Sequence, residues 1–575
     1  VEGNDSEIIC DKQSMAFYIL NCSNFKMSNL SVDYDPLCFT QGQILSVTSD
    51  HLTWKVKICG GYPLTDISTN KLELFDKNTL TLKENYWTIY SGFTYTQSSD
   101  ILTITKTAAT SPYSETVGDY VVMDVVPSGN IQSHGIKISA CKNLIMDNVT
   151  MYGANTFSFF ETDCENSTYN RCKVTRKTDD PNVSVPRLRA GNADGIHSKH
   201  ATVGLTITNC RVENNSDDCI AVNGNFYPVY NVDQANGYLY LLSSETTPKV
   251  QSGDSIVLVD NNGIIIGNSK ALTLTSTTPT ATEISTCEAL FTAGMASPAN
   301  YTKGFKVSIP TWLSGISVGD LIYSKARTGN NFKIENDTVG YNRARGILVK
   351  ASNGTIKNNY VRGCMLGGIV LAPEFYWMEA GCSSNVEISN NLISKCMFEA
   401  SSWGQSQAAP LTVISFNGSK AISAAGGFTN ISIHDNIITG CPKPNVVLTS
   451  INGYSYYNNQ LTPDLTMVRQ HGKNYGITNT DDVWTSNLSG LQSVVTNKID
   501  LKDDNFTFYF NSNSLSVEYK EAKLLKLQLF NVNGLLLQTT AFTKQTNIEL
   551  NNYPHGVYII QISTEGILLN RKIVI

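Results

Sequence analysis

The sequence lacks the features that mark membrane-spanning and nucleic-acid-binding proteins. None of its apolar runs approaches the ~20 residues that a helix needs to cross a bilayer, so we expect no membrane insertion. Its formal net charge is −6 and it has no basic run, which argues against a nucleic-acid partner. At 575 residues the chain is long enough for several domains, or for one repetitive domain with appendages.

The chain also lacks the cysteine spacing of a zinc site. Its fourteen cysteines include no C-x-x-C pair. Many of them lie within apolar, strand-like runs, as Cys172, Cys210 and Cys396 do. Because a buried free cysteine behaves as a small apolar residue, we predict mostly free, stacked thiols, with a disulfide framework as the alternative.

The sequence does contain a repeated hexad: an apolar residue, any residue, an Asn-like residue, a small or apolar residue, any residue and an apolar residue. Two intervals between copies are 23 residues and the others are longer. The eight copies are MSNLSV (27–32), MDNVTM (146–151), YNRCKV (169–174), ITNCRV (207–212), IKNNYV (356–361), ISNNLI (388–393), IHDNII (433–438) and YYNNQL (456–461). Short strands repeated without helices predict a parallel β-helix, with Asn at its tight corners. A β-sandwich with Asn-rich turns is the alternative.

Two long gaps, from about 42 to 125 and from about 225 to 340, interrupt the repeat. Both are rich in Thr, Ser, Val and Ile, and they close on the similar phrases VGDYVVM and VGDLIYS. Each then re-enters the coil at a Gly-containing strand, HGI at 134–136 and RGI at 345–347. Since loops of this length without structure of their own are rare, we predict two related, small antiparallel β-barrels inserted into the coil.

Three carboxylates stand between the two insertions: Asp194, and the adjacent pair Asp217 and Asp218. In a coil that repeats about every 23 residues, the pair lies one turn away from Asp194. Crowded carboxylates raise one another's proton affinity, and a proton donor beside a proton acceptor is what glycoside hydrolysis requires. An Asp-Gly turn and a solvated corner are the structural alternatives for these residues.

Further candidates surround these acids in the sequence, and each has a structural alternative. A histidine close to an acid could hold a sugar hydroxyl. His197 and His200 are both candidates, and His197 is favoured because it follows Asp194 more closely in the sequence. An arginine could orient a carboxylate bidentately or form an ion pair at a coil corner. An exposed tryptophan on a loop would stack on a sugar, unless it packs the loop. The predicted substrate-binding residues are His197, Arg189, Arg345, Trp377 and Glu379.

These residues lie within segments that resemble glycoside hydrolase family 110, the inverting α-1,3-galactosidases of gut and marine bacteria. The segments are FYILNCSNFKMSNLSVDYDPLCFTQGQI, NADGIH, NSDDCIAVNG, RARGILVKASNGTIKNN and WMEAG, spread over residues 17–400. The resemblance implies a right-handed β-helix with inserted β-barrels. It also implies an exo-acting hydrolase that releases terminal α-1,3-linked galactose with inversion. Its partners would be galactose-terminated glycans, with no metal or other cofactor, and the oligomeric state is left open.

The three acids also resemble those of polygalacturonases, although the Gly-His-Gly and Arg-Ile-Lys motifs of that family are missing here. By that order, Asp217 is the expected general acid, and Asp194 and Asp218 are the bases that share the attacking water. Adjacent turns lie ~4.8 Å apart, so side-chain reach could open the gap of about 6.5–9.5 Å that an inverting enzyme leaves for water.

Three alternatives of other kinds stay open at this point. They are a polygalacturonase-like hydrolase, a polysaccharide lyase and a non-catalytic glycan-binding surface protein. A lyase needs a basic residue to abstract a proton, usually with Ca²⁺, whereas this stretch is rich in acids. An adhesin gives no reason for the clustered carboxylates.

The hexads stop after about residue 461, and the rest of the chain follows another pattern. Alternating strands joined by Asn-Gly and Glu-Gly turns predict a small β-sandwich. The phrases FNVNGLLL, HGVYIIQI and KIVI resemble the C-terminal sorting domain of type IX-secreted Bacteroidetes proteins, which implies a secreted, periplasmic or cell-surface protein. The predicted fold is therefore all-β: a right-handed parallel β-helix at 1–41, 126–224 and 341–461, β-barrels at 42–125 and 225–340, a linker at 462–498 and a β-sandwich at 499–575.

Overall fold

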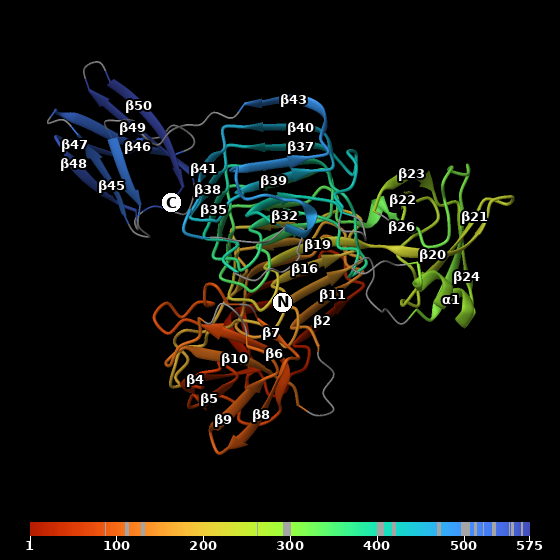
Figure 1. The fold of residues 1–575 in the computed structure, drawn as a ribbon, viewed down its shortest axis with the longest axis horizontal. Coiled ribbons are helices and arrows are strands. Elements are labelled where there is room, and N and C mark those ends of the chain that lie inside the picture. Colours follow the sequence, from red (N-terminus) through yellow and green to blue (C-terminus); the bar gives the residue numbers. More distant parts are fainter. Residues whose placement is uncertain are drawn as a thin grey trace.

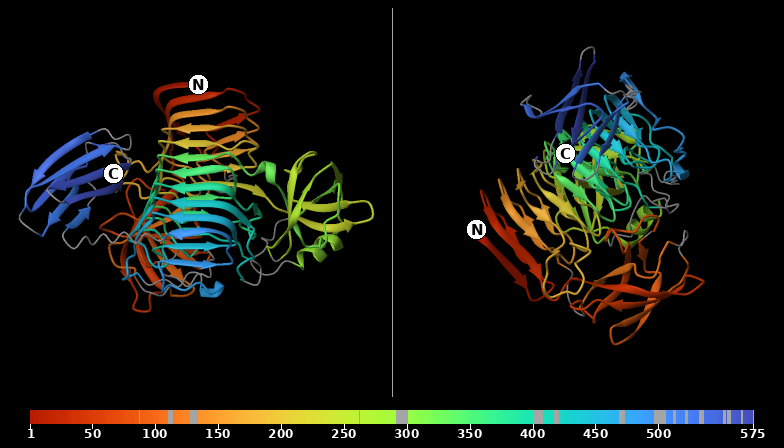
Figure 2. Two further views of the ribbon diagram at one scale, coloured as in Figure 1. Left: turned by 90° about the horizontal axis from the view of Figure 1, so that it is seen from above. Right: turned by 90° about the vertical axis from the view of Figure 1, so that its left-hand side faces the viewer.

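The computed structural model describes the chain apart from residues 87, 110–113, 128–132, 262, 291–300, 400–407, 417–420, 468–472, 496–505, 511–513, 521–522, 532–535, 551–552, 554–556, 565–566 and 575. Outside these gaps the chain is all-β but for α1 (Ala281–Glu288), η1 (Lys325–Arg327) and η2 (Lys473–Tyr475). A long stack of strands forms a coil, and smaller β domains lie around it (Figure 1 and Figure 2). Among the described helices none is long and apolar enough to cross a membrane.

The coil is a parallel β-helix made of two long sheets, as the hexads predict. The first sheet contains β1 (Glu2–Cys10), β3 (Lys26–Tyr34), β12 (Ile145–Met151), β14 (Thr168–Asn170), β15 (Lys173–Val174), β17 (Thr206–Thr208), β18 (Arg211–Glu213), β27 (Lys333–Glu335), β28 (Thr338–Gly340), β30 (Gly354–Lys357), β31 (Tyr360–Arg362), β34 (Ser384–Ser389), β35 (Leu392–Ser394), β37 (Phe428–His434), β38 (Ile437–Thr439), β40 (Ile451–Tyr457), β41 (Gln460–Thr462) and β43 (Ser489–Val495). The second contains β2 (Phe17–Leu20), β11 (Ile136–Ser139), β13 (Phe159–Thr162), β16 (Ile196–Lys199), β19 (Ile220–Asn225), β29 (Ile347–Val349), β32 (Ile369–Leu371), β36 (Leu411–Val413), β39 (Val446–Thr449) and β42 (Val483–Ser486), with β33 (Glu379–Ala380) paired to β19.

The hexads stack in register. Their first residues pair in parallel from coil to coil, and each is at most 5% exposed. This buried column is Met27, Met146, Tyr169, Ile207, Ile334, Ile356, Ile388, Ile433 and Tyr456. The third residue of every hexad has a left-handed backbone, with φ between +53° and +64°, even where Arg171 or Asp435 replaces asparagine. The preference for Asn at this position therefore follows from the corner that the chain must turn.

The column contains a ninth copy, IENDTV at 334–339, which lies inside the second predicted insertion. The coil therefore resumes at β27 and not at residue 341. It also continues beyond residue 461, because β42 and β43 pair with β39 and β40 in parallel. These two strands lie in the segment predicted to be an irregular linker, and the polar composition there concealed them.

The fourth position of the later hexads holds a buried ladder of amides. Asn359, Asn391, Asn436 and Asn459 each donate from Nδ2 to an isoleucine carbonyl of the preceding coil at 2.9–3.0 Å. Asp337 ends this ladder, and its Oδ2 is buried without a hydrogen bond. Burial raises the pKa of Asp337 well above its usual range. A carboxyl here thus costs stability that an amide would not.

We expect Asp337→Asn to raise the free energy of unfolding by about 1 kcal/mol at pH 7. Its new Nδ2 would donate to the Ile207 carbonyl, as the ladder's pattern predicts. The gain in stability should be smaller at pH 4. The pKa of Asp337 is raised in the folded state, so the cost of burying its charge appears only as the pH rises above the pKa of the unfolded chain. Urea unfolding at both pH values measures this. Asn359→Asp should have the opposite sign, and a lower midpoint for Asp337→Asn at pH 7 would contradict the prediction.

The two insertions are related to each other, as the VGD phrases predict. Each is a seven-stranded antiparallel sheet curled into a half-barrel, and the two sheets have the same strand order. The first runs β7 (Ile89–Tyr90), β6 (Ile67–Phe75), β10 (Tyr120–Val125), β4 (Phe39–Val47), β5 (Thr53–Ile58), β9 (Ile101–Lys106), β8 (Phe93–Ser98). The second runs β23 (Ile265–Lys270), β22 (Ser255–Val259), β26 (Leu321–Ser324), β20 (Tyr227–Asp233), β21 (Tyr238–Ser243), β25 (Lys303–Ser308), β24 (Thr273–Thr277). In the VGD turns Gly118 and Gly319 have φ of +97° and +93°, which explains the shared glycine.

The C-terminal part forms two antiparallel sheets around one apolar core. Residues of both sheets share this core, among them Leu515, Leu527 and Ile560. The sheets contain β44 (Phe506–Phe510), β45 (Ser514–Tyr519) and β48 (Gln545–Glu549), and β47 (Leu536–Phe542), β46 (Leu525–Asn531), β49 (Val557–Thr564) and β50 (Ile567–Val574). This arrangement is a β-sandwich.

The coil interior is filled by aliphatic residues and stacked thiols. All fourteen cysteines are free, which confirms the prediction of free thiols over a disulfide framework. The thiols stack along the coil: the Sγ of Cys441 accepts from the Cys396 N–H at 3.2 Å, and that of Cys141 from the Cys22 N–H at 3.4 Å.

Candidate active site

Ionisable side chains gather where the chain enters three neighbouring strands of the second sheet. The first residues of β16, β19 and β29 pair in register. Asp194, Asp218 and Arg345 each stand two residues before one of these positions, so they form one column across three coils. Backbone hydrogen bonds fix the column: the Gly195 N–H donates to the Asp218 carbonyl at 2.9 Å, and the Cys219 N–H to that of Arg345 at 3.0 Å.

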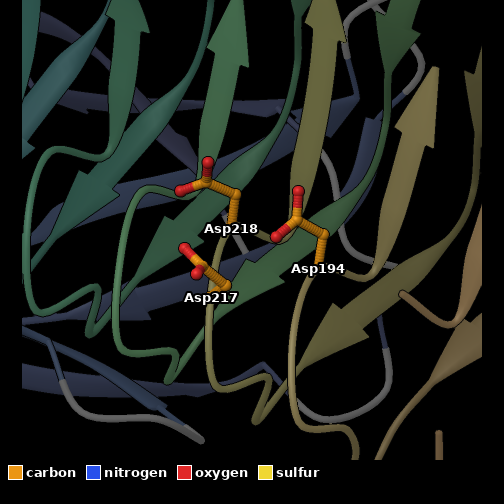
Figure 3. Close-up of side chains that lie close together, drawn as sticks. All are labelled: Asp194, Asp217 and Asp218. Carbon is orange, nitrogen blue, oxygen red and sulfur yellow. The ribbon is translucent and has the colours of Figure 1, made fainter. Parts of the chain in front are cut away.

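The three predicted acids lie together. Asp194 comes from one coil and Asp217 and Asp218 from the next, and one carboxylate oxygen of each lies within 4.8 Å of the other two (Figure 3). Asp194 and Asp218 are buried, whereas 37% of the Asp217 side chain is exposed. Burial raises the pKa of Asp194 and, more strongly, that of Asp218, and the nearby Asp217 acts in the same direction. The site thus separates two enclosed acids from one that faces solvent.

Two arginines of the following coil hold these acids. The Arg345 N–H donates to Asp218 Oδ1 at 2.8 Å, and its Nη2 lies 3.0 Å from Oδ2. Arg343, which the sequence analysis missed, places Nη2 2.5 Å from Asp217 Oδ2 and donates from Nε to the Ser216 carbonyl at 2.7 Å. The phrase RAR at 343–345 carried the missing signal, because both arginines stand in the short turn that leads into β29.

His197, the second residue of β16, lies beside Asp194. Its Nδ1 is 2.7 Å from Asp194 Oδ2, and its ring stacks on Phe157 with the centroids 4.7 Å apart. The Nε2 atom is buried without a hydrogen bond, 4.0 Å from Glu379 Oε1. A buried nitrogen without a partner beside three acids is suited to receive a hydroxyl of a ligand.

Glu379 reaches the site on a loop that folds back onto the sheet, where β33 pairs antiparallel with the end of β19. Lys350, which is fully buried, donates to Glu379 Oε2 at 2.9 Å and to Glu374 Oε2 at 3.0 Å. Glu374 also accepts from Arg345 Nη2 at 2.8 Å. Burial is the largest effect on the pKa of Glu379 and raises it, but Lys350, His197 and Lys199 together lower that pKa to about 2. Lys350 and Glu374 are further site residues that the sequence analysis missed.

Arg189 and Trp377 do not join this cluster. Arg189 is only 1% exposed, and its guanidinium is paired with Glu73 and Asp124 of the first half-barrel. We therefore correct its predicted role from substrate binding to anchoring of that half-barrel. Trp377 is 61% exposed and stands edge-on to Tyr376 at the tip of the loop that carries Glu379. Its ring is therefore open to solvent.

Three carboxylate oxygens this close together are also a donor set that a divalent cation could use. Groups of the protein also contact these acids. Arg343 contacts Asp217, Arg345 contacts Asp218, and His197 is bonded to Asp194. The two guanidinium groups would therefore compete with a cation for Asp217 and Asp218.

The comparison with protein families bears on this site. Residues 124–239, which include all three acids, match the family described as glycosyl hydrolases family 28. The chain carries a β-helix glycoside hydrolase domain of the family 28 type. Residues 511–575 of this hydrolase match the family described as secretion system C-terminal sorting domain. That match confirms the predicted sorting domain and identifies a secreted or cell-surface bacterial protein.

The hydrolase is also similar to individual proteins. It is 22% identical to the Alpha-1,3-galactosidase B of Bacteroides thetaiotaomicron over 502 residues, which cover 83% of this chain and 76% of the relative. Among solved structures, the A-module of an Azotobacter vinelandii mannuronan C-5 epimerase is 11% identical, with a TM-score of 0.26 and coverage of 64% and 67%. The catalytic domain of a family 87 α-1,3-glucanase in complex with nigerose is 10% identical, with a TM-score of 0.23 and coverage of 79% and 98%.

Proposed function

We propose that the hydrolase is an exo-acting α-1,3-galactosidase that releases terminal galactose from glycans with inversion of configuration. The observation that carries the proposal is the cluster of three acids, on adjacent coils of a domain of the family 28 type. The choice of galactose and of the α-1,3 linkage is supported by the similarity to Alpha-1,3-galactosidase B and by the resemblance to family 110.

In the proposed mechanism Asp217 is the general acid. It is the one of the three acids with a substantially exposed side chain, so it can reach the glycosidic oxygen of a bound glycan. Asp194 and Asp218 activate the attacking water and must be charged to do so. The hydrogen bond from His197 and the charge of Arg345 favour that charged form against the effect of burial.

The sugar is held by the polar atoms that the protein leaves unused. The Nε2 of His197 and the Nε of Arg345 are both buried without hydrogen bonds, on coils that adjoin the acids. A sugar hydroxyl can donate to a neutral imidazole nitrogen and accept from a guanidinium N–H. Glu379 supplies a second acceptor near His197, and Trp377 would stack on a more distant residue of the glycan.

The stereochemical outcome rests on the resemblance and not on the spacing of the acids. One oxygen of each acid lies within 4.8 Å of the other two. That is shorter than the gap of about 6.5–9.5 Å between the carboxyl groups of a typical inverting enzyme. The acids therefore lie closer together than the sequence predicted, and inversion is proposed from the resemblance to family 110 alone.

A polygalacturonase-like activity is the second candidate, favoured by the match to glycosyl hydrolases family 28. A uronate substrate carries a carboxylate that needs a free cation in the site. In the described residues around the acids, Arg343, Arg345 and Lys350 are each already paired with a carboxylate of the protein. This pairing favours a neutral sugar over a uronate.

Incubation with a panel of α-linked galactosides should release galactose fastest from the α-1,3-linked members, and polygalacturonate should stay intact. Proton NMR during the first turnover should show the β-anomer of galactose, because inversion of an α-linkage yields it. Release of the α-anomer first would exclude inversion, and cleavage of polygalacturonate alone would exclude the galactosidase. Addition of a Ca²⁺ chelator controls for a lyase, whose activity would be lost.

A further inference from the structure

One aromatic side chain of the first half-barrel lies beside Arg343, the arginine that contacts Asp217. Tyr90 stands at the end of β7, and the Cζ atom of Arg343 lies 5.6 Å from the centroid of its ring. On its other sides Arg343 contacts Asp217 Oδ2 at 2.5 Å and the Ser216 carbonyl at 2.7 Å. The guanidinium is therefore held by an ion pair, a hydrogen bond and a ring face, and only 6% of the residue is exposed.

A second contact ties the half-barrel to the same turn. Glu73 of β6, which is 1% exposed, accepts a hydrogen bond from the Ser216 hydroxyl. It also accepts from Arg189 Nη2 at 2.6 Å. The residue just before Asp217 and the arginine beside Asp217 are thus both held from the half-barrel.

We propose that Arg343, supported by Tyr90 of the first half-barrel, is a positioning residue for Asp217. It engages Oδ2, so Oδ1 is the oxygen that carries the proton toward the glycosidic bond. The inference rests on the proposed role of Asp217 as general acid. It gives the inserted half-barrel a part in the reaction, which neither the family matches nor the sequence analysis assigns to it.

Charge gives the same contact a second effect. Asp217 lies beside the carboxylates of Asp194 and Asp218 and the guanidinium groups of Arg343 and Arg345. Glu73 and the hydroxyl of Tyr90 are the other titratable groups beside Arg343. Removal of Arg343 leaves the three carboxylates with less positive charge nearby, which disfavours loss of a proton from the cluster.

Arg343→Gln is the direct test, with kcat/KM measured against pH on two substrates. On an α-1,3-linked galactose disaccharide we expect a loss of about 10- to 100-fold, and on a nitrophenyl galactoside a clearly smaller one, since proton transfer limits only the first. The basic limb of the disaccharide profile should move up by about 1–3 pH units, because an opposite charge beside the acid has been removed. Arg343→Lys keeps that charge, so its basic limb should stay near that of the wild type.

Arg362 offers a matched control in the following coil. Its Nε donates to Glu213 Oε1 at 2.8 Å, and its Cζ lies 4.8 Å from the ring centroid of Tyr341. Arg362→Gln removes the same kind of contact from a carboxylate that is not one of the three acids, so it should leave the pH profile unchanged. Tyr90→Leu should show a weaker form of the Arg343→Gln result, and it serves as the test if Arg343→Gln does not fold.

Two failures are distinguishable. If Arg343→Gln slows both substrates equally and leaves the basic limb in place, Arg343 is only structural and the inference is wrong. If Asp217→Ala itself shows no dependence on the leaving group, the assignment of the general acid is wrong, whatever Arg343 does.

Discussion

Asp217→Ala should lose about 10²–10⁴-fold in kcat/KM on a natural α-1,3-galactoside and far less on a nitrophenyl galactoside. Nitrophenolate leaves without protonation, so it does not need the general acid. The basic limb of the pH profile should also disappear for the activated substrate, because no group has to stay protonated. Asp217 is exposed enough that its truncation should leave the fold intact.

Asp194→Ala and Asp218→Ala are the matched comparison within the same cluster. Both should be severely impaired on the natural and the activated substrate, because the water must still be activated. Both acids are buried, so their truncation to Ala would also leave a cavity. Asp194→Asn and Asp218→Asn should therefore be measured as well, because Asn fills the space but cannot act as a base. If Asp194→Ala is instead the variant that spares the nitrophenyl substrate, the acid has been assigned to the wrong residue.

The pH profile of the wild-type enzyme tests the same assignment from the other side. Burial raises the pKa of Asp194 and Asp218. If these residues are the bases, the acidic limb should lie above the usual aspartate value of about 3.9, because they must lose their protons before they can act. An acidic limb at or below that value would point to other bases.

The sequence predicted the coil well because one physical requirement repeats in it. Each hexad needs a left-handed corner residue with a buried apolar residue two positions before it. Both requirements can be recognised from the residue types in the sequence. The ninth hexad was missed because Asp337 occupies its fourth position, where the recognised copies have Leu, Val, Cys or Asn. β42 and β43 were missed because their sequences do not match the hexad pattern. Only their parallel pairing with β39 and β40 places them in the coil.

The candidate site was only partly visible in the sequence. The three acids follow from the period of the coil, Arg345 from the phrase at which the coil resumes, and His197 from its nearness to Asp194. Lys350 and Glu374 could not be found in this way, because their partners are brought to them by the return of the loop at β33. Arg189 was assigned the wrong role because its partners, Glu73 and Asp124, belong to the first half-barrel. The sequence does not show how that half-barrel packs against the coil.

Lys350→Met should destabilise the protein by about 3–5 kcal/mol at pH 7, the cost of leaving buried carboxylates without their partner. Lys350 has no exposed surface and is paired with both Glu374 and Glu379. The loop between these glutamates carries Trp377, and β33 holds it to the sheet. Activity should therefore fall even at temperatures where the variant is folded, because Glu379 loses its position beside His197.

The stability difference should depend on pH in a defined direction. The folded pKa of Glu379 is depressed to about 2 from 4.5, so its contribution is present above 4.5 and is lost as the pH falls toward 2. Lys350 has a raised pKa, so its contribution is complete anywhere below 10.5. Urea midpoints of wild type and Lys350→Met should hence differ most near pH 7 and differ clearly less at pH 3.5.

Lys142→Met is the matched control for this prediction. Lys142 lies 2.8 Å from Glu165, but the two side chains are 62% and 38% exposed. Such a pair contributes about 0–1 kcal/mol, so its removal should hardly change the urea midpoint. Addition of Glu379→Gln to Lys350→Met should recover part of the lost stability, since one of the two stranded charges is then gone. A difference that stays constant from pH 7 to pH 3.5 would mean that Lys350 acts through packing of its alkyl chain and not through the charge of Glu379.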